Sequence, residues 1–112
     1  MVKIKIAEDF SRTPGPRLKK EGSFSGELFR EVLLAPLIKK AIEANDSLEV
    51  DLDGTAGYGT SFLEESFGGL IRIEKIPFEK ITSTLILASF EDKSYIEEIF
   101  GYIKDANEQE KK

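Results

Sequence analysis

Strand-like and helix-like stretches alternate along this chain, and their order limits its fold more than any other feature. Apolar residues alternate with charged ones over Val2–Ile6 and again over Leu48–Asp53, which indicates two half-buried strands. The uncharged run Thr82–Ala88 is typical of a third, more deeply buried strand. A stretch with helical spacing follows each of them. The order predicts an α/β fold with a small open, mostly parallel sheet and helices.

Each predicted helix begins at a recognisable capping residue. Ser25 can cap a helix that extends to about residues 45–46, and Pro36 must kink or restart it because proline lacks an N–H group. The capping-box patterns at residues 61–64 and 94–97 predict the starts of two more helices. The residues expected to form the buried stripe of the first helix are Leu28, Phe29, Val32, Leu33, Leu37, Ile38, Ala41 and Ile42.

The residue types that the chain lacks exclude much of enzyme chemistry. It contains no cysteine and no histidine among its 112 residues. Thiolate nucleophiles and cysteine-based zinc sites are therefore excluded, and so is the side chain that most often acts as a general base near neutral pH. We expect a protein that is not an enzyme and that carries neither a metal nor another cofactor.

Length and charge restrict the organisation of the chain and its partners. We expect a single domain over residues 1–106 and a charged, flexible tail over residues 107–112. The formal net charge of -5 argues against a nucleic-acid partner, which would need a basic face. No apolar run approaches the roughly 20 residues of a membrane span, and the amino terminus lacks the features of a signal peptide. These features predict a cytoplasmic protein that binds neither nucleic acid nor membrane.

Two unusual loops are expected to meet at one edge of the sheet. The segment Ser11–Arg17 holds a Pro-Gly-Pro turn, and Gly54–Thr60 is rich in glycine. If the first helix makes the usual right-handed crossover, the strands before these loops are parallel and end at the same edge. Open α/β sheets bind their ligands at that edge. We therefore expect the functional site where the two loops meet.

Arg12, Thr13 and Arg17 are the candidate binding residues of the first loop. The two arginines lie on either side of the turn and can each grip a phosphate or a carboxylate with two hydrogen bonds. The alternative is that they are ordinary solvated surface residues. Phe10 and Phe24 frame the loop, and we expect them to anchor it to the core.

Asp51 and Asp53 are candidate magnesium ligands or acid–base groups at the end of the second strand. Alternation along the strand places both carboxylates on one side. The favoured alternative is structural: one carboxylate caps the next turn, and the other is solvated or pairs with Arg12 or Arg17. It is favoured because no histidine and no third ligand accompany the pair.

The glycine-rich loop and the helix after it form the last candidate site. The backbone N–H groups of Gly57, Tyr58 and Gly59 can bind an anion together with the positive end of the helix dipole. Equally, the glycines can serve only to allow the positive φ angles of a tight turn. The hydroxyl of Ser61 is explained as the N-cap of the helix, whereas that of Thr60 has no structural explanation.

Several of these motifs resemble those of a known bacterial family. The runs Phe10–Arg17, Phe24–Arg30 and Asp51–Gly69 resemble the STAS-like domain family of unknown function, whose members tend to accompany GHKL-type ATPases or to be fused to them. The shorter run Val50–Leu63 is distantly similar to the STAS domains of sulfate transporters and anti-sigma-factor antagonists. This resemblance also implies a STAS-like α/β fold.

The resemblance implies a partner-switching protein. Such a protein binds an ATP-dependent, kinase-like partner and is released or silenced when its loop is phosphorylated. By position, Thr60 falls where the family's usual phosphoacceptor serine stands, and Ser61 falls on the next serine. The expected function is a non-enzymatic interaction module with a GHKL-type ATPase as its protein partner. The alternative is a domain that binds a small anionic ligand or a nucleotide through Arg12, Arg17 and residues 54–61.

Overall fold

Three short strands form an open parallel sheet in the computed structural model of the chain, which describes residues 1–112. They are β1 (Val2–Lys5), β2 (Leu48–Asp51) and β3 (Leu85–Ala88), and β2 lies between the other two. Both pairs of neighbouring strands are parallel and pair over their full length. The α/β class and the parallel sheet expected from the sequence are confirmed.

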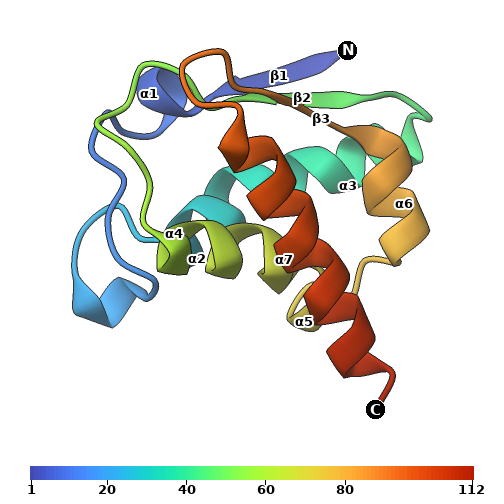
Figure 1. Ribbon diagram of the computed structural model, residues 1–112. Helices are drawn as coiled ribbons and strands as arrows, with labels where there is room; N and C mark the ends of the chain where they lie inside the picture. The colour runs from blue at the N-terminus through green and yellow to red at the C-terminus, as the bar shows by residue number, and fades with distance from the viewer.

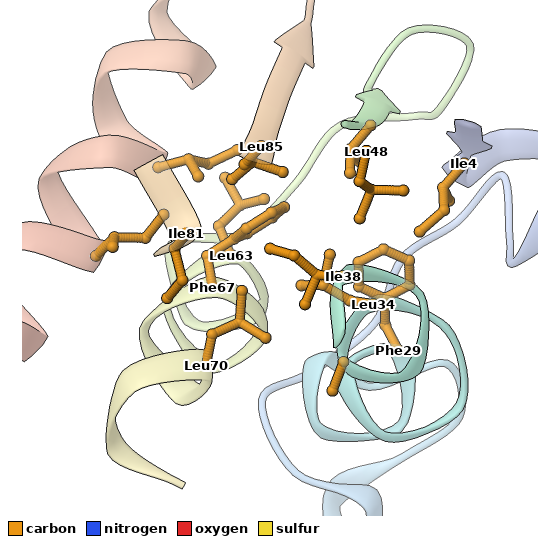
Figure 2. Packing of buried hydrophobic residues seen from close by; sticks show 14 of the residues in the cluster. Ile4, Phe29, Leu34, Ile38, Leu48, Leu63, Phe67, Leu70, Ile81 and Leu85 are labelled. Carbon is orange, nitrogen blue, oxygen red and sulfur yellow. The ribbon is translucent and has the colours of Figure 1, made fainter. Parts of the chain in front are cut away.

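The long helices lie on one face of this sheet (Figure 1). Alternation along the strands turns Ile4, Leu48 and Leu85 toward the helices, where they pack in one apolar core with side chains such as Ile38 and Phe67 (Figure 2). Burial of apolar surface between these two layers is the main source of stability for a domain of this size.

The other face of the sheet carries charged residues that pair between strands. Lys3 Nζ lies 3.3 Å from Glu49 Oε2, and Lys5 Nζ lies 3.2 Å from Asp51 Oδ2. Each pair joins direct neighbours in the register of β1 and β2. The half-buried character predicted for the first two strands follows from this division between an apolar and a charged face.

The first long helix extends from residue 26 to residue 43 and widens near its middle. Its parts are α2 (Gly26–Phe29), the π-helical turn η2 (Arg30–Leu34) and α3 (Ala35–Glu43). As predicted, Ser25 caps it, because its hydroxyl accepts a hydrogen bond from the Leu28 N–H at 3.0 Å. Pro36 lies in the first turn of α3. The wide turn directly before it makes room for a ring that would clash with the preceding turn of a regular helix.

The π turn changes which residues of this helix face the core. Phe29, Ile38 and Ala41 are buried as predicted, but Val32 is 53% exposed. Leu34, which was not expected in the stripe, is fully buried instead. Phe29 and Leu34 are five residues apart, which is the spacing of a π turn rather than of an α-helical turn.

The helix after the glycine-rich loop has the same construction. It consists of α4 (Thr60–Leu63), the π-helical turn η3 (Glu64–Gly68) and α5 (Gly69–Arg72). Phe62 and Phe67 are fully buried. The helix begins at Thr60 with Gly59 as its N-cap, so the predicted capping by Ser61 is wrong. Glu64, the other half of the expected capping box, pairs with arginines instead.

The third strand is shorter than predicted and lies at an edge of the sheet. Residues 82–84 end the helix α6 (Phe78–Thr84), and the strand begins only after them. The hydroxyls of Thr82 and Ser83 donate to backbone carbonyls three residues earlier at 3.3 Å, which supports a helical backbone despite the strand preference of threonine. Ile86 is 43% exposed. The prediction of a deeply buried strand over Thr82–Ala88 is therefore wrong.

Both ends of the chain are more helical than expected. The one-turn helix α1 (Ile6–Asp9) replaces the end of the first predicted strand. The last helix, α7 (Ser94–Glu110), starts where predicted but without the capping box, because Ser94 N–H and Oγ donate to Asp92 Oδ1 at 3.0 and 2.5 Å. It includes residues 107–110, which the sequence assigned to a charged tail. Neither α7 nor any other helix combines the length and the apolar composition of a membrane span.

Candidate functional site

Three loops meet beyond the carboxyl ends of the strands (Figure 1), and for the first two this meeting was predicted from the parallel order. The Ala56 N–H, after β2, donates to the Arg12 carbonyl at 2.8 Å. The loop after β3 joins them, because the Asp53 carboxylate accepts the N–H groups of Phe90 and Glu91 at 3.0 Å. Glu91 in turn accepts the Gly54 N–H at 2.7 Å. We call this surface the loop edge; it consists of residues 11–25, 52–61 and 89–93.

Asp51 and Asp53 both have structural partners at the loop edge. Asp51 pairs with Lys5 and accepts the Asp53 N–H at 3.0 Å, while Asp53 holds the backbone of the loop after β3. The expected cap is present, but the cation that pairs with Asp51 is Lys5 and not an arginine. No group of three or more acidic side chains is close enough to hold a metal ion.

Most N–H groups of the glycine-rich loop form hydrogen bonds within the loop or to neighbouring segments. The Gly57 N–H donates to Thr55 Oγ1 at 3.2 Å, and the Tyr58 N–H donates to the Tyr95 hydroxyl at 3.3 Å. Gly54 and Gly57 have φ angles of 92° and 123°, which only glycine adopts readily. These observations favour the tight-turn interpretation over an anion site.

The side chain of Tyr58 fixes this loop to the end of β2. Its hydroxyl donates to the Leu52 carbonyl at 2.7 Å, and its ring packs edge-on against Tyr95 with centroids 5.2 Å apart. Burial raises the pKa of the Tyr58 hydroxyl, so the group stays protonated and keeps donating. Tyr58 therefore has a structural role within the site.

Thr60 and Ser61 are exposed at the start of the helix. Neither hydroxyl forms a hydrogen bond within the chain. Gly59, before them, has an ordinary φ of -75°, and a Cβ atom there would meet nothing within 4 Å. The two hydroxyls are thus exposed and have no partner within the chain.

The predicted basic residues of the first loop have different environments. Arg12 and Thr13 are exposed, and the Arg12 guanidinium has no ion-pair partner. Arg17 is instead engaged, with NH1 2.5 Å from Glu64 Oε1 and 3.3 Å from Glu65 Oε1. The two arginines do not converge on a common empty site.

Phe10 anchors the first loop to the core, as expected. Its ring packs edge-on against Phe24 and Phe29, with centroid distances of 5.6 and 5.2 Å. Phe24 remains 43% exposed and has a φ of 54°, an uncommon angle for a residue with a side chain. The loop is thereby held to the core through aromatic contacts.

A buried ion pair that was not predicted from the sequence joins the helix over residues 26–43 to the helix over residues 60–72. Arg30 is only 2% exposed, and its NH1 donates to Glu65 Oε2 at 2.6 Å and to the Glu65 carbonyl at 2.8 Å. Its Nε also donates to Glu74 at 3.3 Å. The only signal in the sequence was an arginine directly after Phe29, a residue expected to be buried. In the structure Gly69 leaves room for it, because a Cβ there would collide with the guanidinium.

Glu64 extends this ion-pair network to the loop edge. Arg72 donates to both of its oxygens at 2.7 and 3.1 Å, and Arg17 donates to one of them. Burial opposes ionisation of Glu64, but the two guanidinium groups outweigh it and hold the pKa of the carboxyl below its usual value. Arg17 thus connects the first loop to the helix that begins at Thr60.

The two pockets of the molecule lie away from the loop edge. The larger has a volume of about 260 Å³ and the smaller about 170 Å³, and both adjoin α3 and α6. Neither is lined by any residue that the sequence analysis proposed for the site. A small ligand would find no preformed pocket at the loop edge.

An open parallel sheet with helices on one face and its loops gathered beyond the strand ends is consistent with a STAS-like domain. Residues 25–95 match the family model of the STAS-like domain of unknown function (DUF4325), and the chain belongs to that family. The run Phe10–Arg17, which also carried the resemblance, lies outside the matched residues. No curated protein and no solved structure matches the chain. Family membership suggests a regulatory or interaction module.

Proposed function

We propose that this protein is a non-enzymatic interaction module that binds a GHKL-type ATPase through its loop edge and is released when the ATPase phosphorylates Thr60 or Ser61. The observation that carries the proposal is the pair of exposed, unbonded hydroxyls in the first turn of the helix that follows the glycine-rich loop. Membership of a STAS-like family supports an interaction role.

Phosphorylation at this position has a clear chemical consequence. The hydroxyl oxygen attacks the γ-phosphorus of ATP, the bond to the bridging oxygen breaks, ADP leaves, and the hydroxyl proton passes to a base of the partner. The product carries about 1.5 to 2 negative charges at neutral pH and three acceptor oxygens. A partner surface that fits the neutral hydroxyls would therefore lose affinity.

The loop edge also offers side chains of the types that protein interfaces favour. Phe90 is 80% exposed, yet its backbone is fixed because its N–H donates to both carboxylate oxygens of Asp53, at 3.0 and 3.1 Å. Arg12 presents a guanidinium without an ion-pair partner. Aromatic residues and arginine are enriched at interfaces and at their energetic centres.

The alternative, a site for a small anion or a nucleotide, has less support. Arg17 is already paired with Glu64 and Glu65, and the loop's N–H groups are largely bonded. The hollows lie at α3 and α6, away from these residues. An interaction surface needs no such pocket.

The proposal is tested by measuring the affinity of the chain for a GHKL-type ATPase recovered with it from host lysate. Thr60→Glu should weaken binding at least tenfold, because a fixed negative charge replaces a neutral hydroxyl, while Thr60→Ala should bind like the wild type. Thr82→Glu is the matched control, since Thr82 is an exposed threonine on α6, outside the loop edge. Equal binding of the two glutamate variants would refute the proposal.

A further inference from the structure

We propose that the larger pocket, which adjoins α3 and α6, binds a compact organic anion: a phosphate or carboxylate group attached to a small apolar body. The pocket has a volume of about 260 Å³. Its lining combines three lysines, one carboxylate and two isoleucines: Lys39, Lys75, Lys80, Glu43, Ile42 and Ile76. The pocket lies away from the loop edge and is not part of the proposed function.

The charge of this pocket is opposite to that of the whole chain. The chain has 16 basic and 21 acidic residues, which give it a formal net charge of -5. The pocket is lined by three cations and by a single carboxylate, that of Glu43. Glu43 is exposed, so water solvates its charge. An anion is therefore attracted to this place on a molecule whose net charge repels it.

Each of the three lysines has N–H donors available for a ligand. Lys80 has no ion-pair partner, whereas Lys39 Nζ lies 2.8 Å from Glu74 Oε1 and Lys75 Nζ lies 2.6 Å from Glu110 Oε1. An ammonium group has three donors, and each of these contacts occupies only one of them. Exposed ion pairs of this kind contribute little free energy, so a bound anion can share or replace them.

Replacement of these contacts leaves neither glutamate uncompensated. Glu74 also accepts a hydrogen bond from Arg30 Nε at 3.3 Å. The side chain of Glu110 is 39% exposed, so water can solvate its carboxylate when Lys75 turns to a ligand. The cost of binding an anion at the lysines is therefore small.

The apolar part of the lining favours a ligand that carries more than a charge. Ile76 is only 7% exposed, and the half-buried Ile42 packs against the core, whereas the three lysines are exposed. An apolar body that covers the isoleucines removes further apolar surface from water. The volume is below the roughly 300–1,000 Å³ of typical sites for drug-sized ligands, so the ligand must be compact.

The backbone around the pocket is fixed in the absence of a ligand. The helices α3 and α6 pack against each other (Figure 1). The Ile76 N–H donates to the Leu70 carbonyl at 3.0 Å, and the Ile81 N–H donates to the Pro77 carbonyl at 3.1 Å. Lys75 has a φ of 58°, an uncommon angle for a residue with a side chain. A pocket that is already formed binds its ligand without the cost of ordering its walls.

The test follows the amide resonances of the full chain by NMR while phenyl phosphate is added. This probe joins an anionic group to a small apolar ring, whereas inorganic phosphate and phenol each have only one of these features. We expect saturable shifts centred on residues 39–43 and 75–80, and binding of the other two compounds that is at least threefold weaker. The absence of saturable shifts, shifts centred on the glycine-rich loop, or equally tight binding of phenol would overturn the proposal.

Lys80→Gln should weaken the binding of phenyl phosphate about three- to tenfold, because it removes the ammonium group that has no other partner. Lys20→Gln is the matched control, since Lys20 is an exposed lysine of the loop edge and its loss changes the net charge by the same amount. This variant should bind like the wild type. Amide spectra establish that both variants are folded. Equal weakening in the two variants would show that only the overall charge matters, and the proposal would then be wrong.

Discussion

At the scale of single residues, the buried pair of Arg30 and Glu65 matters most for stability. Its charges are removed from water and are compensated by short hydrogen bonds, including one to the Glu65 carbonyl. Loss of one partner of a buried pair is far more costly than the pair's net contribution, because the other charge stays buried and unpaired. Loss of one partner of an exposed surface pair costs little, because water solvates the charge that remains.

We predict that Glu65→Gln lowers the free energy of unfolding by about 3 kcal/mol, because Arg30 loses its buried counter-charge. Urea unfolding followed by circular dichroism measures the change. Glu110→Gln is the control, as it breaks the exposed pair with Lys75. A loss of similar size in both variants would contradict the importance assigned to burial.

Gly69 and Gly59 offer a matched pair of glycine substitutions. Gly69→Ala should destabilise the protein by about 1–3 kcal/mol, because the new Cβ overlaps the Arg30 guanidinium. Gly59→Ala should change stability by no more than about 1 kcal/mol, since its φ is ordinary, the space around it is open, and the poorer N-cap preference of alanine opposes its entropic advantage. Thermal unfolding of the two variants should give shifts of opposite sign or of clearly different size, and equal shifts would show that the contact with Arg30 is unimportant.

The pH dependence of stability should reflect Glu64. Its pKa is lower in the folded chain than its usual value of 4.5, because Arg72 and Arg17 outweigh the effect of burial. A carboxyl with a depressed pKa contributes stability above its unfolded-state pKa and loses that contribution as the pH falls through the folded value. The free energy of unfolding should therefore decline below about pH 4.5, and less steeply in Glu64→Gln. The free energy of unfolding is measured by urea titration at each pH. An equally steep decline with falling pH in the wild type and in Glu64→Gln would be inconsistent with the ion pairs of Glu64.

At the scale of elements, the helix over residues 26–43 and the helix over residues 60–72 each contain a π turn. Each of these turns contains one member of the buried pair. Arg30 opens η2, and Glu65 lies within η3. Single π turns inside helices are frequent at functional sites. Here they lie side by side and orient the arginine and the carboxylate toward each other.

The shift in spacing caused by η2 can be tested with two alanine substitutions. Leu34→Ala should cost about 2–5 kcal/mol, because Leu34 is fully buried. Val32→Ala should change stability by no more than about 0.5 kcal/mol, because Val32 is largely exposed. Denaturant unfolding that ranked the two variants in the opposite order would support the regular helical stripe predicted from the sequence.

The elements show where prediction from sequence succeeds and where it does not. Local signals were sufficient for the Ser25 cap, since a serine before a helical pattern supplies the needed acceptor by itself. The predicted capping box at Ser61 is absent because Glu64 pairs with Arg17, from a loop far away in sequence, and with Arg72, from the end of the same helix. The π turns could not be predicted from periodicity, which assumes a constant turn.

At the scale of the whole molecule, topology predicted more of the site than any motif did. Parallel strands end at the same edge, so the meeting of the loops that contain Arg12 and Ala56 followed from the order of elements alone. The loop after β3, with Phe90 exposed on it, was not predicted as part of the site. Its attachment depends on the Asp53 carboxylate, a contact between residues far apart in sequence that no local pattern signals.

The most direct test of the central claim is a pull-down from host lysate supplemented with ATP, followed by mapping of phosphorylated residues on the chain by mass spectrometry. We predict recovery of a GHKL-type ATPase, with phosphate on Thr60 or Ser61 of the fraction that is released. Recovery of the chain alone and without phosphate, even when the ATPase is abundant in the lysate, would contradict it.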